Sequence, residues 1–294
     1  MFLELNDITI QIELGEEMLK MKKLILLVII LFCSSLLFAT EFTITKNTDG
    51  TCEITEYLGQ QKYLEIPSTI DGYEVTSIGY RAFALALSVK GVVIPKTVTF
   101  IGEEAFLFCP LLEKIEIPES VTSIGSFAFY GCDSLESITI PESVTSIGES
   151  AFSRCKLLEN IKVDENNPIY TQIQGVLFNK IENILLTFPI TKTIVSYSIP
   201  NGIVHIGESA FSGCNSLESI IIPESVTSIG ESAFSGCDSL ESITIPESVT
   251  SIGDYIFIGC DNLREIKVKE GSFAYNFFNN EKFSHLLDYT PSWL

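Results

Sequence analysis

The sequence predicts a solenoid of about nine stacked β-strand and turn units of 23 residues, with a parallel sheet on one face. One phrase recurs almost unchanged from Ile140, from Ile222 and from Ile245. Repeat periods of 20–50 residues are typical of solenoids, in which stacked units share a continuous core. Three residue types step by 23: Phe83, Phe106, Phe129, Phe152, then Phe211, Phe234, Phe257; Gly79, Gly102, Gly125, Gly148, then Gly207, Gly230, Gly253; and Cys109, Cys132, Cys155, then Cys214, Cys237, Cys260.

Each unit contains one short strand with an I-x-I pattern. In residues 132–152 this pattern directs Ile138 and Ile140 inward and Thr139 outward. The proline that follows cannot donate to a ladder, so the strand ends there. Gly148 permits a tight turn, and residues 149–152 are long enough for about one helical turn. Stacking then places identical residues in ladders about 4.8 Å apart.

The same pattern marks nine strands along the chain, with two irregular intervals. Residues 69–73 lengthen the first interval, and residues 164–198 interrupt the array. Within the interruption, segments 175–179 and 184–188 flank 180–183 and predict a β-hairpin. The nine strands are 64–66, 92–94, 115–117, 138–140, 161–163, 197–199, 220–222, 243–245 and 266–268.

Five segments follow from this organisation. The ends of a solenoid expose apolar surface and strand edges, so covering segments are expected at both. Residues 40–60 contain a hairpin pattern around 47–50 and predict an N-terminal cap, and the aromatic residues of 271–294 predict a C-terminal helical cap. The repeat domain lies between them, at 61–270. We interpret 21–39 as a signal peptide and 1–20 as an extension that precedes the true translation start, expected at Met18 or Met21.

The segment 21–39 has the order of features of a secretory signal. Lys22 and Lys23 precede an apolar run, and the segment ends at Ala39, after which cleavage is expected. A membrane anchor is the alternative, but a spanning helix needs about 20 apolar residues and this run is shorter. Attachment to the membrane through a lipid on Cys33 is a second alternative to cleavage after Ala39. The mature chain is therefore expected to be secreted or held at the cell surface, without inserting into the membrane.

The unit L-x-x-I-x-I-P-x-x-V-x-x-I-G-x-x-A-F-x-x-C closely resembles the BspA-like class of leucine-rich repeats. Residues 66–79 resemble its opening repeat, 163–178 its interrupted repeat and 271–275 its closing segment. The resemblance covers about residues 42–280. It implies a right-handed leucine-rich repeat solenoid, and surface adhesion as the commonest role. It supplies no catalytic residues, and a fold alone does not define an activity.

Composition argues against several kinds of chemistry. A net charge of −20 disfavours nucleic-acid binding, which relies on Lys and Arg at phosphates. The six periodic cysteines lack the spacing of a zinc site and are expected to be buried, reduced thiols, whereas Cys52 lies outside the ladder and is expected to be the most reactive. His205 and His285 suggest no catalytic triad, so we expect a protein that is not an enzyme and has no cofactor.

The acidic residues also repeat. We interpret their rows as a solvated face, and weak calcium binding between stacked carboxylates is the alternative. The rows are Glu113, Glu136, Glu159, Glu218 and Glu241, and Glu119, Glu142, Glu224 and Glu247.

The outward residues of the strands differ between units, whereas the ladder residues are committed to packing. A broad stacked surface suits a protein or glycoprotein ligand better than a small substrate. We therefore expect protein binding or adhesion on this face, with the 164–198 excursion as a lateral contact; a structural or self-associating envelope component is the alternative. The candidate residues are Glu116, Thr139, Lys162, Ser198, Ile221, Thr244 and Lys267.

Overall fold

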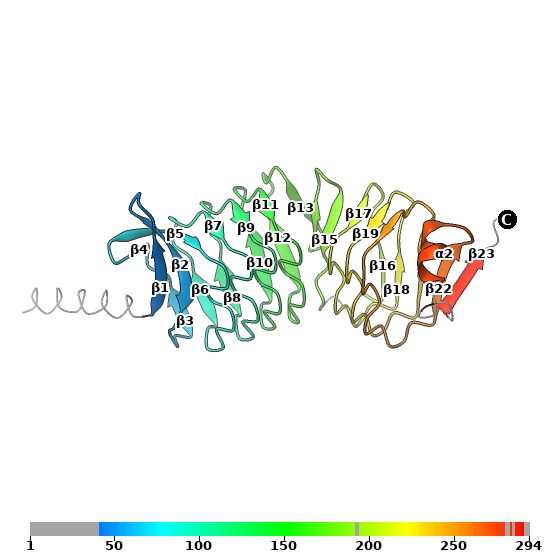
Figure 1. Cartoon of the computed structure of the whole chain (residues 1–294), viewed down its shortest axis with the longest axis horizontal. Helices are drawn as coiled ribbons and strands as arrows, with labels where there is room; N and C mark the ends of the chain where they lie inside the picture. Colours follow the sequence, from blue (N-terminus) through cyan, green and yellow to red (C-terminus); the bar gives the residue numbers. More distant parts are fainter. Residues whose placement is uncertain (1–40, 192–193, 280–282, 284–285, 291–294) are drawn as a thin grey trace, which may run out of the picture.

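A computed structural model describes residues 41–191, 194–279, 283 and 286–290. The chain coils into a solenoid whose turns stack along the long axis of the molecule, from β1 at one end to β23 at the other (Figure 1). The expected segments 1–20 and 21–39, with the cleavage site and Cys33, lie outside the described residues, as does His285.

The first ladder confirms the nine predicted I-x-I strands. In each strand the first inward position of the I-x-I pattern, such as Ile138 in β10, is buried, and its two neighbours along the chain are half-buried or exposed. Paired strands run parallel with an offset of 23 residues, except for the 28 between β3 and β6, so that Ile243 lies opposite Ile220 and Ile266. The strands are β3 (Tyr63–Glu65), β6 (Gly91–Val93), β8 (Lys114–Glu116), β10 (Ser137–Ile140), β12 (Asn160–Val163), β16 (Ser196–Ser198), β18 (Ser219–Ile221), β20 (Ser242–Thr244) and β22 (Glu265–Lys269).

A second parallel ladder was not predicted. It is formed mostly by the Ser-Ile pair that precedes the repeated glycine, and most of its strands are only two residues long. The glycines in this corner do not have a left-handed conformation. A Cβ at Gly102 would lie only 2.7 Å from the backbone carbon of Gly79, so glycine is required by the close approach of neighbouring turns. The strands are β5 (Tyr73–Ile78), β7 (Phe100–Ile101), β9 (Ser123–Ile124), β11 (Ser146–Ile147), β17 (His205–Ile206), β19 (Ser228–Ile229) and β21 (Ser251–Ile252).

The third side of each unit, called here the turn side, is not the helical turn that was expected over 149–152. Its N–H groups alternate between two acceptors: Phe129 N donates to Ala151 O of the next unit (2.8 Å), and Tyr130 N donates to Phe127 O three residues back (3.0 Å). Left-handed residues such as Ser150 (φ 54°) and Arg154 (φ 58°) make this alternation possible. Half of the donors therefore bond between turns, which a helix does not allow.

The interior consists of stacked identical side chains, in two clusters. Rings Phe83, Phe106, Phe129 and Phe152 stack at centroid distances of 4.8, 5.3 and 5.6 Å. A second series runs through Phe188, Phe211, Phe234 and Phe257 at 5.2, 5.3 and 5.9 Å. The buried residues divide in the same way into one core up to Leu177 and another from Val176 onward. We call residues 41–163 the N-terminal block and the described residues of 184–290 the C-terminal block.

The interruption between the blocks contains the predicted hairpin and one further strand. β14 (Val176–Asn179) pairs antiparallel with β15 (Ile184–Thr187), and β13 (Tyr170–Ile173) pairs antiparallel with β14. β15 then pairs parallel with β17, so the meander begins the second ladder of the C-terminal block.

The two ends of the solenoid differ. At the N-terminal end β1 (Phe42–Lys46) and β2 (Thr51–Tyr57) form an antiparallel pair, β2 continues the sheet through β5, and β4 (Thr69–Ile70) adds a short strand beside β5. At the other end the expected helix is only α2 (Phe273–Phe278), and β23 (Leu287–Thr290) pairs parallel with β22. The C-terminal segment thus contributes a strand as well as a short helix. That both ends act as caps stays a prediction.

Candidate functional site

The strand face, defined as the outward side chains of the nine I-x-I strands, carries all seven predicted site residues. Each is exposed because its two neighbours along the chain turn toward the core or the strand end. Ile221, for example, keeps 59% of its surface exposed between buried Ile220 and Ile222. The predicted inward and outward directions are therefore confirmed for Glu116, Thr139, Lys162, Ser198, Ile221, Thr244 and Lys267.

The structure does not bring the seven residues onto one continuous sheet. β12 pairs only with β10, and β16 pairs only with β18, so no ladder joins Lys162 to Ser198. Figure 1 shows the two groups of strands on either side of the interruption. The predicted interruption after residue 163 separates these two groups. In the N-terminal block, Glu116 lies on the β3–β6–β8 sheet, and Thr139 and Lys162 lie on the β10–β12 pair. In the C-terminal block, one sheet that begins with β16 and β18 carries Ser198, Ile221, Thr244 and Lys267.

The charged members of the strand face differ in their pairing. Glu116 forms an ion pair with Lys114 on its own strand (2.8 Å), and Lys267 forms one with Glu265 (3.0 Å). No described side chain forms an ion pair with Lys162. Exposed ion pairs of this kind contribute about 0–1 kcal/mol to stability. Glu116 and Lys267 can therefore exchange their present partners for charged groups of a ligand.

Two hollows interrupt the strand face. The first, of about 330 Å³, lies in the C-terminal block, where Thr244 and Lys267 line it together with Glu224, Glu247 and Lys269. Lys269 pairs with Glu247 there (2.7 Å). Two of the predicted residues therefore border a concave part of the surface.

The second hollow, of about 470 Å³, lies in the N-terminal block and was missed by the sequence reasoning. Glu116 lines it, but so do Tyr63, Gly91, Val93 and Lys114, which were not among the candidates. Gly91 could have indicated this hollow from the sequence, because none of the other eight strands has a glycine at this register.

Five of the six ladder cysteines are buried as expected, and Cys260 is half-buried. Each Sγ donates to the carbonyl of the phenylalanine 26 residues earlier, for example Cys109 to Phe83 O (3.0 Å) and Cys237 to Phe211 O (3.1 Å). Burial raises the pKa of the Cys155 thiol to about 12, which disfavours the reactive thiolate. All seven cysteines of the described chain are free thiols.

The expectation that Cys52 is the most reactive thiol was wrong. Cys52 lies on β2, between β1 and β5 in the sheet. Its side chain is fully buried, and its Sγ donates to Tyr73 O at 3.7 Å. Burial, followed by the charge of Asp71, raises the pKa of this thiol. Among the described cysteines Cys260 is the one that is partly exposed, because it ends the ladder.

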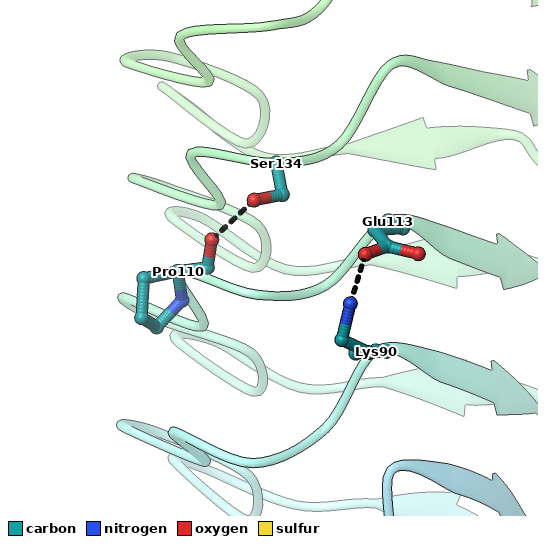
Figure 2. A network of polar contacts seen from close by, with 4 residues as sticks. All are labelled: Lys90, Pro110, Glu113 and Ser134. Carbon is teal, nitrogen blue, oxygen red and sulfur yellow. Dashed lines mark hydrogen bonds and ion pairs between the residues drawn. The ribbon is translucent and has the colours of Figure 1, made fainter.

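The acidic rows are partly neutralised between turns. Figure 2 shows Lys90 reaching Glu113 of the next unit, and Ser134 Oγ donating to Pro110 O (2.7 Å) at the corresponding corner. Within the described residues, no group of three or more His, Cys, Asp or Glu side chains is arranged to hold a metal ion.

His205 Nδ1 lies 2.6 Å from Ser228 Oγ in the second ladder. A search of the described helices finds none with the length and hydropathy of a membrane span.

Known proteins resemble this chain along most of its length. The family model for the BspA type leucine rich repeat region (six copies) matches residues 76–197 and 186–287. A leucine-rich repeat protein from Eubacterium ventriosum is 28% identical over 79% of this chain and 71% of its own, with a TM-score of 0.63. The pneumococcal vaccine antigen PcpA is 25% identical over 67% of this chain and 55% of its own, with a TM-score of 0.58. No curated protein matches the chain.

Proposed function

Because the chain belongs to the BspA-type leucine-rich repeat family, we propose that it is an exported or cell-surface scaffold that binds other macromolecules. The partner is a protein or glycoprotein of a host or a neighbouring cell, and the interaction serves adhesion. The strand face provides the contact surface. The secretory pattern of residues 21–39 supports export.

This proposal rests on one observation: the repeat units differ in sequence at the exposed strand positions and hardly at all in the buried ladders. The buried ladders repeat isoleucine, phenylalanine and cysteine almost without change, since a stacked core tolerates little variation in volume. The exposed strand positions change from acid to hydroxyl to base to apolar: Glu116, Thr139, Lys162, Ser198, Ile221, Thr244, Lys267. Specificity can be encoded at these positions without disturbing the stack.

The test is binding of the mature chain, beginning at residue 40, to a panel of purified extracellular matrix and serum proteins. Lys162→Glu and Ile221→Asp are compared separately, because the two residues lie in different blocks. Each is expected to weaken a strand-face partner about tenfold, or 1.4 kcal/mol. Lys156→Glu and Leu157→Asp, both exposed and outside the nine strands, are the matched controls. Unchanged affinity in the folded strand-face variants moves the site elsewhere, with the hairpin around Lys180 as the next candidate.

Self-association as a structural envelope component is the second candidate. The turn side of the N-terminal block supports it, because Leu85, Leu87, Phe108 and Leu111 are all exposed there. Exposed apolar side chains grouped on one surface are typical of interfaces. Sedimentation at increasing concentration separates the two functions: self-association predicts a rising mass that Phe108→Ser abolishes, without any binding to the protein panel.

A further inference from the structure

The hollow in the N-terminal block is built on a grid of six outward positions, five with a side chain and one with a glycine. β3, β6 and β8 pair in parallel, with Tyr63, Gly91 and Lys114 in one row. Glu65, Val93 and Glu116 form the next row along the strands. Gly91 and Val93 thus form the floor, and the other four side chains stand on both sides of it.

The absence of a side chain at Gly91 opens this hollow. The other eight strands carry tyrosine, lysine, serine, asparagine or glutamate at the same register, and Gly91 has no left-handed φ that would require glycine. The Tyr63 ring lies beside the vacant position, since a Cβ on Gly91 would be 3.0 Å from Tyr63 Cδ1. The result is a space of about 470 Å³ on an otherwise regular sheet.

The floor of the hollow and the wall formed by Tyr63 are apolar, and its rim carries both acidic and basic side chains: Glu65, Glu113, Glu116, Lys90 and Lys114. Tyr63 is 70% exposed and Val93 is 45% exposed, so both offer contact area to a ligand. Glu65 and Glu116 stand on the two strands that flank Val93, about 10 Å apart at the backbone given the 4.8 Å strand spacing. No described side chain forms an ion pair with Glu65.

The cations at this site do not close it to a positively charged ligand. The Lys114–Glu116 pair is largely exposed, at 75% and 60% for the two side chains. Such a pair contributes about 0–1 kcal/mol, so Lys114 can leave Glu116 to solvent or ligand at little cost. Lys90 is paired with Glu113 at the edge of the hollow, away from Glu65 and Glu116.

An arginine side chain matches these features. Its apolar stem fits over Gly91 and Val93, and its planar guanidinium can stack on the Tyr63 ring. The same group has five donors and can bind two carboxylates at once, whereas a lysine ammonium is a compact point charge. The net charge of −20 on the chain also attracts a basic partner over long range.

We propose that this hollow binds an arginine side chain presented by an extended, basic segment of the protein partner. The inference rests on the proposed function of the strand face and adds the chemistry of one contact. Glu65 and Glu116 bind the guanidinium, Tyr63 covers its plane, and Gly91 provides the space.

The test uses fluorescent nine-residue peptides that alternate threonine with arginine, lysine or glutamine. The arginine peptide is expected to bind wild-type protein, the lysine peptide about tenfold more weakly, and the glutamine peptide not measurably. Gly91→Asn fills the hollow with an asparagine side chain. The fold is expected to tolerate this residue, because β12 already carries an asparagine, Asn160, at the same register. It should weaken the arginine peptide at least tenfold, as should Glu65→Gln combined with Glu116→Gln.

Two matched variants distinguish this site from general charge attraction. Ser137→Asn places the same asparagine at the same register on β10, and Glu119→Gln with Glu142→Gln removes the same charge from exposed positions outside the strands. Both are expected to bind like wild type. Equal losses in the control and hollow variants, or unchanged binding in folded Gly91→Asn, overturn the proposal. Failure of the arginine peptide while a panel protein still binds the strand face also overturns it, and leaves the proposed function standing.

Discussion

The N-terminal and C-terminal blocks share one interior and differ on the outside. Both stack phenylalanine rings at centroid distances of 4.8–5.9 Å. In both, the cysteine thiols donate to equivalent phenylalanine carbonyls, for example Cys155 to Phe129 O and Cys237 to Phe211 O. On the turn side, however, one register varies in the N-terminal block and repeats glycine in the C-terminal block. It reads Leu85, Phe108, Gly131 and Arg154 in the first and Gly213, Gly236 and Gly259 in the second, and all seven residues have a positive φ. The comparison teaches that stacking restricts the inside of a unit strongly and its outer surface very little.

The junction between the blocks uses a different kind of contact. Within a block, backbone N–H groups on the turn side bond to the next unit. Across the junction the hydroxyl of Ser150 donates to Glu208 Oε1 (3.2 Å), and that of Ser153 donates to Ser209 O (3.3 Å). Single side-chain bonds contribute about 0.5–1.5 kcal/mol each, so we expect the two blocks to be less tightly coupled to each other than their internal turns are.

The largest expected effect comes from removing a stacked ring in either block. Phe129→Ala and Phe234→Ala each delete a fully buried ring that has a ring neighbour on both sides. Each is expected to destabilise its block by about 3–5 kcal/mol, measured by denaturant unfolding. Thr139→Ala on the strand face is the control and should cost little. Comparable losses at Thr139 and Phe129 would contradict the inward and outward assignment, and clearly unequal losses at Phe129 and Phe234 would contradict the equivalence of the two interiors.

A smaller effect is expected from adding a methyl group in the glycine corner. Gly230→Ala places a Cβ 2.6 Å from the backbone nitrogen of Glu208, whereas Gly207→Ala beside the junction places it 3.0 Å from Leu185 O. Overpacking against backbone costs about 1–3 kcal/mol, and we expect Gly230→Ala to be the more destabilising. Thermal unfolding of both variants measures the difference; a larger loss for Gly207→Ala would show that the junction is packed as tightly as a block.

The cysteine ladders predict different accessibility at the ends of the two blocks. Cys109, Cys132 and Cys155 are all buried in the first ladder, whereas Cys260 at the end of the second is partly exposed. A thiol reagent is expected to label Cys260 at least tenfold faster than the others, a ratio that corresponds to about 1.4 kcal/mol. The absolute rate should be slow, because the hydrogen bond with Cys237 and burial raise the pKa of the Cys260 thiol. Mass spectrometry of the native protein, with Cys260→Ser as control, identifies the labelled residue, and modification of Cys52 first would show that the N-terminal strands open.

The smallest expected effect is a pH dependence at the junction. Burial, then the hydrogen bond and charge of Glu149, raise the pKa of the Glu208 carboxyl above its ordinary value of 4.5. A raised acid pKa means that the folded state binds the proton more tightly than the unfolded state, so this contribution is present below pH 4.5 and is lost as pH rises through the raised value. Glu208→Gln should therefore stabilise the protein slightly at neutral pH, by less than about 1 kcal/mol, and not at pH 4.

The control for this prediction is Glu136→Gln, an exposed residue that is not among the groups that shift the pKa of Glu208. It should leave the pH dependence of the melting temperature unchanged. A gain for Glu208→Gln that is equal at pH 4 and pH 7 would mean that Glu208 does not titrate differently in the folded protein.

The sequence by itself determined which residues are equivalent and therefore which ones stack. A period of 23 places Phe129 beside Phe106 and Phe152, and the I-x-I alternation directs Ile138 inward and Thr139 outward. Burial follows from these local patterns because each side chain meets its own copy in the next turn. The exposure of all seven candidate residues could be predicted for the same reason.

Only the tertiary structure decided what depends on contacts between turns. Two-residue strands such as β9 have no periodicity of their own and exist through bonds to neighbouring turns. The separation of Lys162 from Ser198 depends on how the intervening meander pairs, and the burial of Cys52 on how β2 packs on β5. The hollow over Gly91 likewise forms because Tyr63 and Lys114, 51 residues apart in the sequence, stand on either side of it. Such juxtapositions follow from pairing across the stack, which a single unit does not encode.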